Sequence, residues 1–161
     1  MKKEEKKLLI YGCYSKLLFS ARSYNNLQAV YRNLAITDLL AVLLADGFLL
    51  SFDKTALPFN PLLGSIVITL IGIISLIFIW YEDIIVQEDY LNTIVFQALK
   101  LEKKHSWLPR LHHNFLHLYE KHKIISFKIT FYIGCQAILF FVLSILTIFS
   151  LYSLNSLTIT S

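Results

Sequence analysis

The stretch from Leu62 to Tyr81 contains no charged residue in 20 positions. An α-helix rises 1.5 Å per residue, so about 20 apolar residues cover the ~30 Å hydrocarbon core of a bilayer. A second stretch, Phe127 to Leu154, is equally apolar, and its only charge is Lys128 at its entrance. Both stretches are therefore predicted to be transmembrane helices.

A third stretch, Leu34 to Phe52, is long enough to span but contains Asp38 and Asp46. Each aspartate near the centre of a span costs about 2.5–3.5 kcal/mol, and each leucine returns about 0.5 kcal/mol. The whole chain is 56% apolar and only 16% charged, whereas soluble domains carry about 25% charged residues. We predict that this stretch spans as well, because the alternation of positive charges along the chain, described next, requires a third span.

The positive charges alternate along the chain. Seven lysines and arginines precede Leu34, one lies in the connection 53–61, six lie between Glu82 and Phe127, and none follows Leu154. Segments rich in lysine and arginine remain in the cytoplasm. The pattern predicts a multi-pass protein of the cell (inner) membrane with a cytoplasmic N-terminus and an outer C-terminal tail.

The predicted fold is an all-α membrane protein with three transmembrane helices, an N-terminal amphipathic helix and a kinked cytoplasmic helical segment. Leu17, Tyr24 and Tyr31 recur every seven residues, with Ala21 and Gln28 between them, as on one face of a helix. Pro109 predicts the kink, because proline removes a backbone donor. The expected segments are a cytoplasmic amphipathic helix (1–33), a transmembrane hairpin (34–81), cytoplasmic helices broken at 106–109 (82–126), a third transmembrane helix (127–154) and an outer tail (155–161).

Asp46 is the first candidate for a functional residue, because an ionisable group inside a membrane is a functional hypothesis by default. It could carry a proton, bind a cation or line a pore. Alternatively, it is protonated, hydrogen-bonded to Ser65, Thr69 or Ser75, or close to the outer interface. For Asp38, nearer the cytoplasmic end, we expect a structural ion pair with Lys128 or Arg32.

Two polar clusters admit both a cation-binding and a structural interpretation. His113, His117 and Glu120 can share one helix face and hold zinc, but a surface cluster with some pH sensitivity is the favoured interpretation. The second cluster follows the second span directly; its members are Glu82, Asp83, Glu88 and Asp89. It could bind a hard cation, but a solvated helix start is the favoured interpretation.

Several residues are expected at the lipid–water interface. Trp80, Tyr81 and Trp107 are predicted interfacial anchors, and anionic headgroups are the expected ligands of Lys100, Lys103, Lys104 and Arg110. No motif of nucleophilic, phosphate-binding or zinc-dependent catalysis is found. We therefore predict no catalytic residue, no cofactor, no nucleic-acid partner and no enzymatic activity. The two cysteines, Cys13 and Cys135, are predicted to be free thiols.

The order of residues from Tyr14 to Ser51 resembles the entry to the SLATT group of small bacterial membrane proteins. It reads Y-x-K-L-L-F-S-A-R-S-Y-N-N-L-x-x-x-Y-R, followed by an apolar helix that ends G-F-L-L-S. In that family an amphipathic helix precedes a two-helix hairpin, and a long cytoplasmic helix follows. The resemblance covers roughly the first two-thirds of the chain. It implies a membrane effector of prokaryotic conflict systems, which forms pores when a partner sensor detects a nucleotide signal.

These observations favour a non-enzymatic, homo-oligomeric membrane effector or pore subunit in the lipid bilayer. An alternative is a membrane adaptor that presents its cytoplasmic helices to a soluble partner protein. A third hypothesis is an intramembrane enzyme or transporter that uses Asp46.

Overall fold

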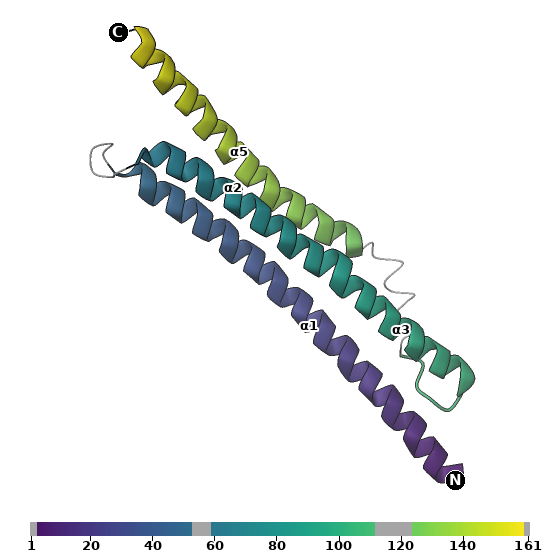
Figure 1. Cartoon of the computed structure of the whole chain (residues 1–161). Helices are drawn as coiled ribbons and strands as arrows, with labels where there is room; N and C mark the ends of the chain where they lie inside the picture. Colours follow the sequence, from purple (N-terminus) through teal and green to yellow (C-terminus); the bar gives the residue numbers. More distant parts are fainter. Residues whose placement is uncertain (1–2, 53–58, 112–123, 160–161) are drawn as a thin grey trace. The chain divides into compact units, whose positions relative to one another are not determined.

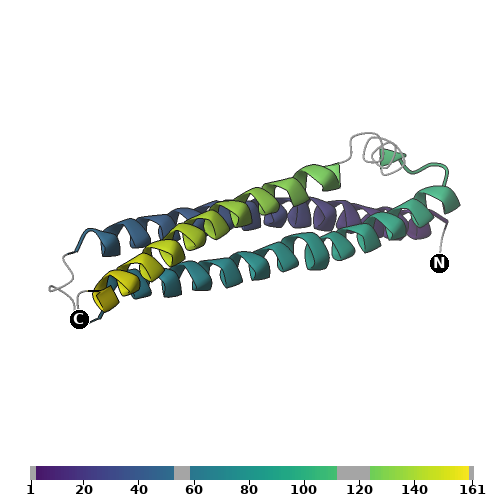
Figure 2. The ribbon, with the colours of Figure 1, turned by 90° about the horizontal axis from the view of Figure 1, so that it is seen from above.

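The computed structural model describes residues 3–52, 59–111 and 124–159, and these residues contain helices and turns but no strand. The expectation of an all-α protein is confirmed. The elements are α1 (Lys3–Leu50), α2 (Pro61–Trp80), η1 (Tyr81–Val86), α3 (Gln87–Lys104) and α5 (Ile124–Ile159) (Figure 1). Of these, η1 is a π-helix, and α2, η1 and α3 follow one another without a break (Figure 2).

Three helical stretches in the described residues are long and apolar enough to cross a membrane: Glu4–Leu50, Pro61–Lys104 and Phe127–Tyr152. The chain is therefore compatible with a small membrane protein. The 48 residues of α1 correspond to about 72 Å of helix at 1.5 Å per residue. The hydrocarbon core is only ~30 Å thick, so more than half of α1 would extend beyond it if this helix crosses a membrane.

The chain divides into two compact units. Unit 1 comprises residues 1–31 and 81–128, and unit 2 comprises residues 32–80 and 129–161. Of the chain's 26 charged residues, only five belong to unit 2. Unit 2 thus collects the apolar stretches, and unit 1 collects the segments that are predicted to face the cytoplasm.

In unit 2, one face of α2 packs against the second half of α1. Most buried residues of α2 recur at steps of three or four, which keeps them on one side of the helix; they include Ser65, Thr69, Gly72, Leu76 and Ile79. On the opposing helix, Ala35, Leu39 and Val42 are buried. The contact of Gly64 with Leu49 and that of Gly72 with Val42 fix an antiparallel register.

Helix α5 joins this pair on α2. The Gln136 side chain donates a hydrogen bond to the Ile73 carbonyl at 3.2 Å. Gly72 lies next to both neighbours, because a Cβ atom added there would be 3.4 Å from Cδ1 of Leu139 on α5, an ordinary contact, but only 2.5 Å from Cγ2 of Val42 on α1. The absence of a side chain at Gly72 thus admits Val42.

In unit 1, the first half of α1 packs against α3. Tyr14, Ala98 and Leu108 form a buried apolar cluster, and the rings of Tyr24 and Tyr90 stack with their centroids 5.6 Å apart. Helix α3 ends at Lys104, immediately before the predicted break, and the chain then turns through a hydrogen bond from the Leu108 amide to the His105 carbonyl. Because Leu108 follows the end of α3, the contacts of α1 in unit 1 extend beyond α3 to this turn.

We expect Gly72→Ala to destabilise the protein, because valine is β-branched and its side chain has little freedom to move away from a new methyl group. Gly12→Ala is the matched control, since a Cβ atom at Gly12 meets nothing within 4 Å. The control should be up to about 1 kcal/mol more stable through helix propensity. Thermal unfolding of both variants in a mild detergent measures the difference. Equal stability of the two would contradict the close approach at Gly72.

Candidate functional site

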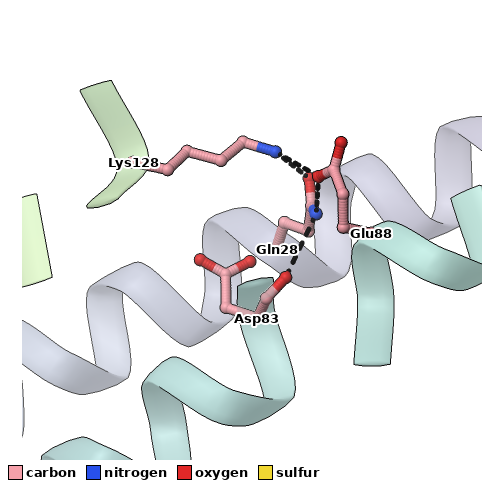
Figure 3. A network of polar contacts seen from close by, with 4 residues as sticks. All are labelled: Gln28, Asp83, Glu88 and Lys128. Atoms are coloured by element: carbon pink, nitrogen blue, oxygen red, sulfur yellow. Dashed lines mark hydrogen bonds and ion pairs between the residues drawn. The ribbon is translucent and has the colours of Figure 1, made fainter. Parts of the chain in front are cut away.

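Four polar residues from four separate helical segments meet in unit 1 (Figure 3). Gln28 lies on α1, Asp83 on η1, Glu88 on α3 and Lys128 near the start of α5. We call this group the polar cluster. All four are buried: their exposed fractions are 2%, 0%, 8% and 5%, respectively. Buried charges persist only when they are paired and hydrogen-bonded.

Lys128 and Glu88 form the ion pair of the polar cluster. The Lys128 ammonium lies 2.8 Å from the Glu88 carboxylate and donates a second hydrogen bond, of 2.9 Å, to the side-chain oxygen of Gln28. The amide nitrogen of Gln28 donates to the same Glu88 oxygen at 3.0 Å and to the Asp83 backbone carbonyl at 3.3 Å. Gln28 thus bridges both charges: its side-chain oxygen accepts from Lys128, and its side-chain nitrogen donates to Glu88, as the chemistry of an amide requires.

The π-helix η1 is the local structure that supplies the Asp83 carbonyl. Turns of π-helix occur mostly as single-turn irregularities within α-helices, often at functional sites. Here the irregularity begins directly after Trp80 and ends directly before Gln87, so it joins α2 to α3. It coincides with the point at which the chain passes from unit 2 to unit 1.

The polar cluster changes the interpretation of the acidic residues after the second span. Asp83 and Glu88 are buried rather than solvated, and Glu88 is paired with Lys128. Asp89 is exposed, as a solvated helix start requires. In the described parts of the chain, no group of three histidine, cysteine, aspartate or glutamate residues could hold a metal ion. His113, His117 and Glu120 lie outside the described residues.

Asp46 and Asp38, the two acids expected to lie inside the membrane, both contact hydroxyl groups of α2 within unit 2. The Thr69 hydroxyl lies 2.8 Å from a carboxyl oxygen of Asp46, and the Ser75 hydroxyl lies 3.2 Å from one of Asp38. Asp46 is only 4% exposed. Of the interpretations left open for Asp46, hydrogen bonding to a neighbouring helix is the one that the geometry matches. Lys128, an expected partner of Asp38, belongs to the polar cluster.

The Thr69 hydroxyl has a second contact, 2.9 Å from the Ser65 carbonyl. A hydroxyl carries one proton and cannot donate to both oxygens at once. Both contacts are satisfied if a neutral Asp46 carboxyl group donates to Thr69, which in turn donates to Ser65. The neutral form is also the one that costs least among apolar side chains.

Tyr14 forms a further buried contact that the sequence did not reveal. Its hydroxyl lies 2.8 Å from the Glu102 carboxylate and 2.9 Å from the Pro109 carbonyl. Burial, and then the contact with Glu102, raise the pKa of Tyr14 above its ordinary value, so the phenol stays protonated at physiological pH. Tyr14 thus ties the corner at Pro109 to α1.

The predicted interfacial residues occupy separate places. Trp80 is half-buried at the end of α2, whereas Tyr81 and Trp107 are 47% and 45% exposed. The four basic residues divide between two cavities of unit 1. Lys103 and Arg110 line one of about 230 Å³, and Lys100 and Lys104 line another of about 630 Å³.

Comparison with family models, with curated proteins and with solved structures found no match to this chain.

We expect Lys128→Met to lower the free energy of unfolding by about 3–5 kcal/mol, because it leaves the Glu88 charge buried without its cation. The double variant Lys128→Met, Glu88→Leu should recover part of this loss, since replacing a buried pair by apolar residues is often neutral, whereas Gln28 loses its hydrogen bonds to both residues. Denaturant unfolding in detergent measures both.

The matched control is Lys7→Met. Lys7 lies 3.4 Å from Glu4, but both side chains are exposed, and exposed pairs contribute little. If Lys128→Met costs no more than this control, the pair is not a structural element.

Proposed function

We propose that the chain is a non-enzymatic subunit of an oligomeric membrane effector that permeabilises the inner membrane, with its N-terminus in the cytoplasm. The main support is that a single copy of the chain buries only a small part of the apolar surface of its own helices. In the most apolar window of each spanning helix, only 22%, 33% and 17% of the residues are buried. The remaining surface is left for lipid and for further copies of the chain. The resemblance to the SLATT group supports the same class of function.

Two glycines support self-association through the spanning helices. A Cβ atom added at Gly47 on α1 or at Gly134 on α5 would meet nothing within 4 Å. Glycine within a helix costs about 1 kcal/mol relative to alanine, and neither glycine is needed for packing within one copy. Small residues on helix surfaces allow close approach of another helix in a membrane. Close contact between copies would use both positions.

The intramembrane acids have a supporting role in this proposal. Asp46 and Asp38 contact Thr69 and Ser75 of the neighbouring helix. They therefore hold the hairpin of α1 and α2 together, and the wall of the pore is left to other side chains. This arrangement gives no support to an intramembrane enzyme or transporter that uses Asp46.

The adaptor hypothesis is favoured by a separate observation in unit 1. Leu8 and Phe19 on α1 are 72% and 76% exposed, and Phe96 on α3 is 59% exposed. If unit 1 faces the cytoplasm, as the charge pattern predicts, these apolar side chains lie in water unless a partner covers them. A soluble partner protein would then bind unit 1, either instead of pore formation or to control it.

Reconstitution into liposomes separates these functions. An effector should release an entrapped dye, and the rate should rise more steeply than linearly with the protein-to-lipid ratio, because several copies are needed. Asp46→Asn should keep this rate within about twofold, since an amide can still donate to Thr69. A changed cation preference in Asp46→Asn would mean that Asp46 lines the pore. Intact liposomes at every ratio, with a soluble protein co-purifying from cells, would favour the adaptor.

Gly134→Leu should reduce cross-linked oligomers of the reconstituted protein severalfold, because the larger side chain keeps a second helix away. Ser144→Leu is the control on the same helix. Ser144 is exposed, its hydroxyl bonds only within its own helix to the Phe140 carbonyl, and ten residues at 3.6 per turn place it about 80° around the helix from Gly134. Equal loss of oligomers in both variants, or in neither, would exclude Gly134 from the contact.

A further inference from the structure

Of the two cavities that the four basic residues line, the larger lies between α1 and α3 in unit 1, and three lysines are among its lining residues. Lys16 of α1 lines it from one side, and Lys100 and Lys104 of α3 line it from the other. We call this cavity the lysine groove. Its volume of about 630 Å³ is within the range of small-molecule sites.

The lysine groove concentrates positive charge without a compensating acid. None of its lining residues is acidic. Within the described chain, no ion pair is formed by Lys16, Lys100 or Lys104. Like charges that converge in one place repel one another, and the repulsion is relieved when an anion binds among them.

The helix dipole accounts for only part of this arrangement. Lysines in the last turn of a helix interact favourably with its C-terminal end, which suits Lys103 and Lys104 of α3. That explanation does not apply to Lys16, which lies in the interior of α1. Lys100 is instead held over the ring of Phe96, with its ammonium 4.4 Å from the ring centroid.

The rest of the lining suits a ligand with both a charged and a less polar part. Leu17 and Leu101 are half-buried residues of the lining, and Ser20 and Gln97 add neutral hydrogen-bonding groups. Lysine is a common phosphate binder because its ammonium is a compact charge with three donors. A phosphate group carries enough charge to engage more than one lysine.

We propose that the lysine groove is a binding site for a phosphate-bearing ligand. The ligand is either the headgroup of an anionic lipid or a soluble phosphate compound, and the two share the recognition chemistry described above. The site does not depend on whether the protein acts as an effector or as an adaptor. Lys103 and Arg110, which the sequence grouped with Lys100 and Lys104, line the other cavity and are not part of it.

Cys13 provides a probe of the groove within the native sequence. It is an exposed free thiol that lines the groove, whereas the other cysteine, Cys135, is buried. The experiment follows the reaction of the detergent-solubilised full chain with N-ethylmaleimide and reads the label on the Cys13 peptide by mass spectrometry. Inorganic pyrophosphate should slow the labelling at least fivefold, with saturation, when sodium chloride keeps the ionic strength constant.

The matched variants localise the effect. The double variant Lys100→Gln, Lys104→Gln should abolish the protection. Lys16→Gln alone should do the same, and because it changes a different helix, it tests whether the result of the double variant comes from a folding defect. Lys103→Gln should retain it, because Lys103 lies on the same helix but does not line the groove. Protection that survives loss of the groove lysines, or that is lost equally in Lys103→Gln, would overturn the proposal.

Lipid nanodiscs distinguish the two sources of phosphate. Slower labelling in discs with phosphatidylserine than in discs with phosphatidylcholine would support a headgroup ligand. Protection by pyrophosphate in phosphatidylcholine discs would support a soluble one. Absence of protection in every arm would overturn the site, and protection by polyglutamate but not by pyrophosphate would overturn the assignment to phosphate.

Discussion

The cost of leaving a polar group without a partner among apolar side chains is the constraint on which this structure depends. A carboxyl or amide group in such a place forfeits its hydrogen bonds to water, which costs several kilocalories per mole unless the protein replaces them. The helices are built from residues that are mostly apolar, so a buried polar side chain costs less where another polar group replaces part of its lost hydrogen bonds. Asp46 with Thr69, Asp38 with Ser75, Glu88 with Lys128 and Tyr14 with Glu102 are four such pairs in the described residues. Each joins two different helices.

These polar pairs specify which helix positions lie opposite one another, which apolar contacts alone would not determine. Helices in lipid gain little from burying leucine against leucine, because lipid tails are equally apolar. A hydroxyl on α2 that meets a carboxyl on α1 is a more selective contact, since sliding one helix past the other would separate the pair. In unit 2 the contacts at Asp46 and Asp38 therefore fix the same antiparallel register that Gly72 permits sterically.

The sequence predicted the all-α class and three long apolar helices correctly, because long stretches with few charges leave little alternative to transmembrane helices. It did not predict that α1 runs without a break from Lys3 to Leu50. It also placed Thr69 among the possible partners of Asp46, since the short connection between two spans limits the choices to one neighbouring helix. The polar cluster was not predicted, because Gln28 and Lys128 are 100 positions apart. Gln28 interrupts an otherwise apolar and aromatic stripe, and that exception was the available signal. The π-helix has no comparable sequence signature. The sequence grouped Lys100 and Lys104 with Lys103 and Arg110, whereas in the structure Lys100 and Lys104 line a cavity together with Lys16. The periodicity of α3 alone cannot show which of its lysines share a cavity with a residue of α1.

Lys128 illustrates how one residue satisfies two demands. Its position at the start of an apolar stretch suits a positive charge on the cytoplasmic side, and a lysine there would ordinarily extend its flexible side chain toward water or headgroups. Instead its ammonium is held by Glu88 and Gln28, and the residue as a whole is only 5% exposed. The start of α5 is consequently positioned by contacts with α1 and α3 rather than by the lipid interface alone. A change that disturbs α1 against α3 would therefore act directly on the first turns of α5, within the same unit of the structure.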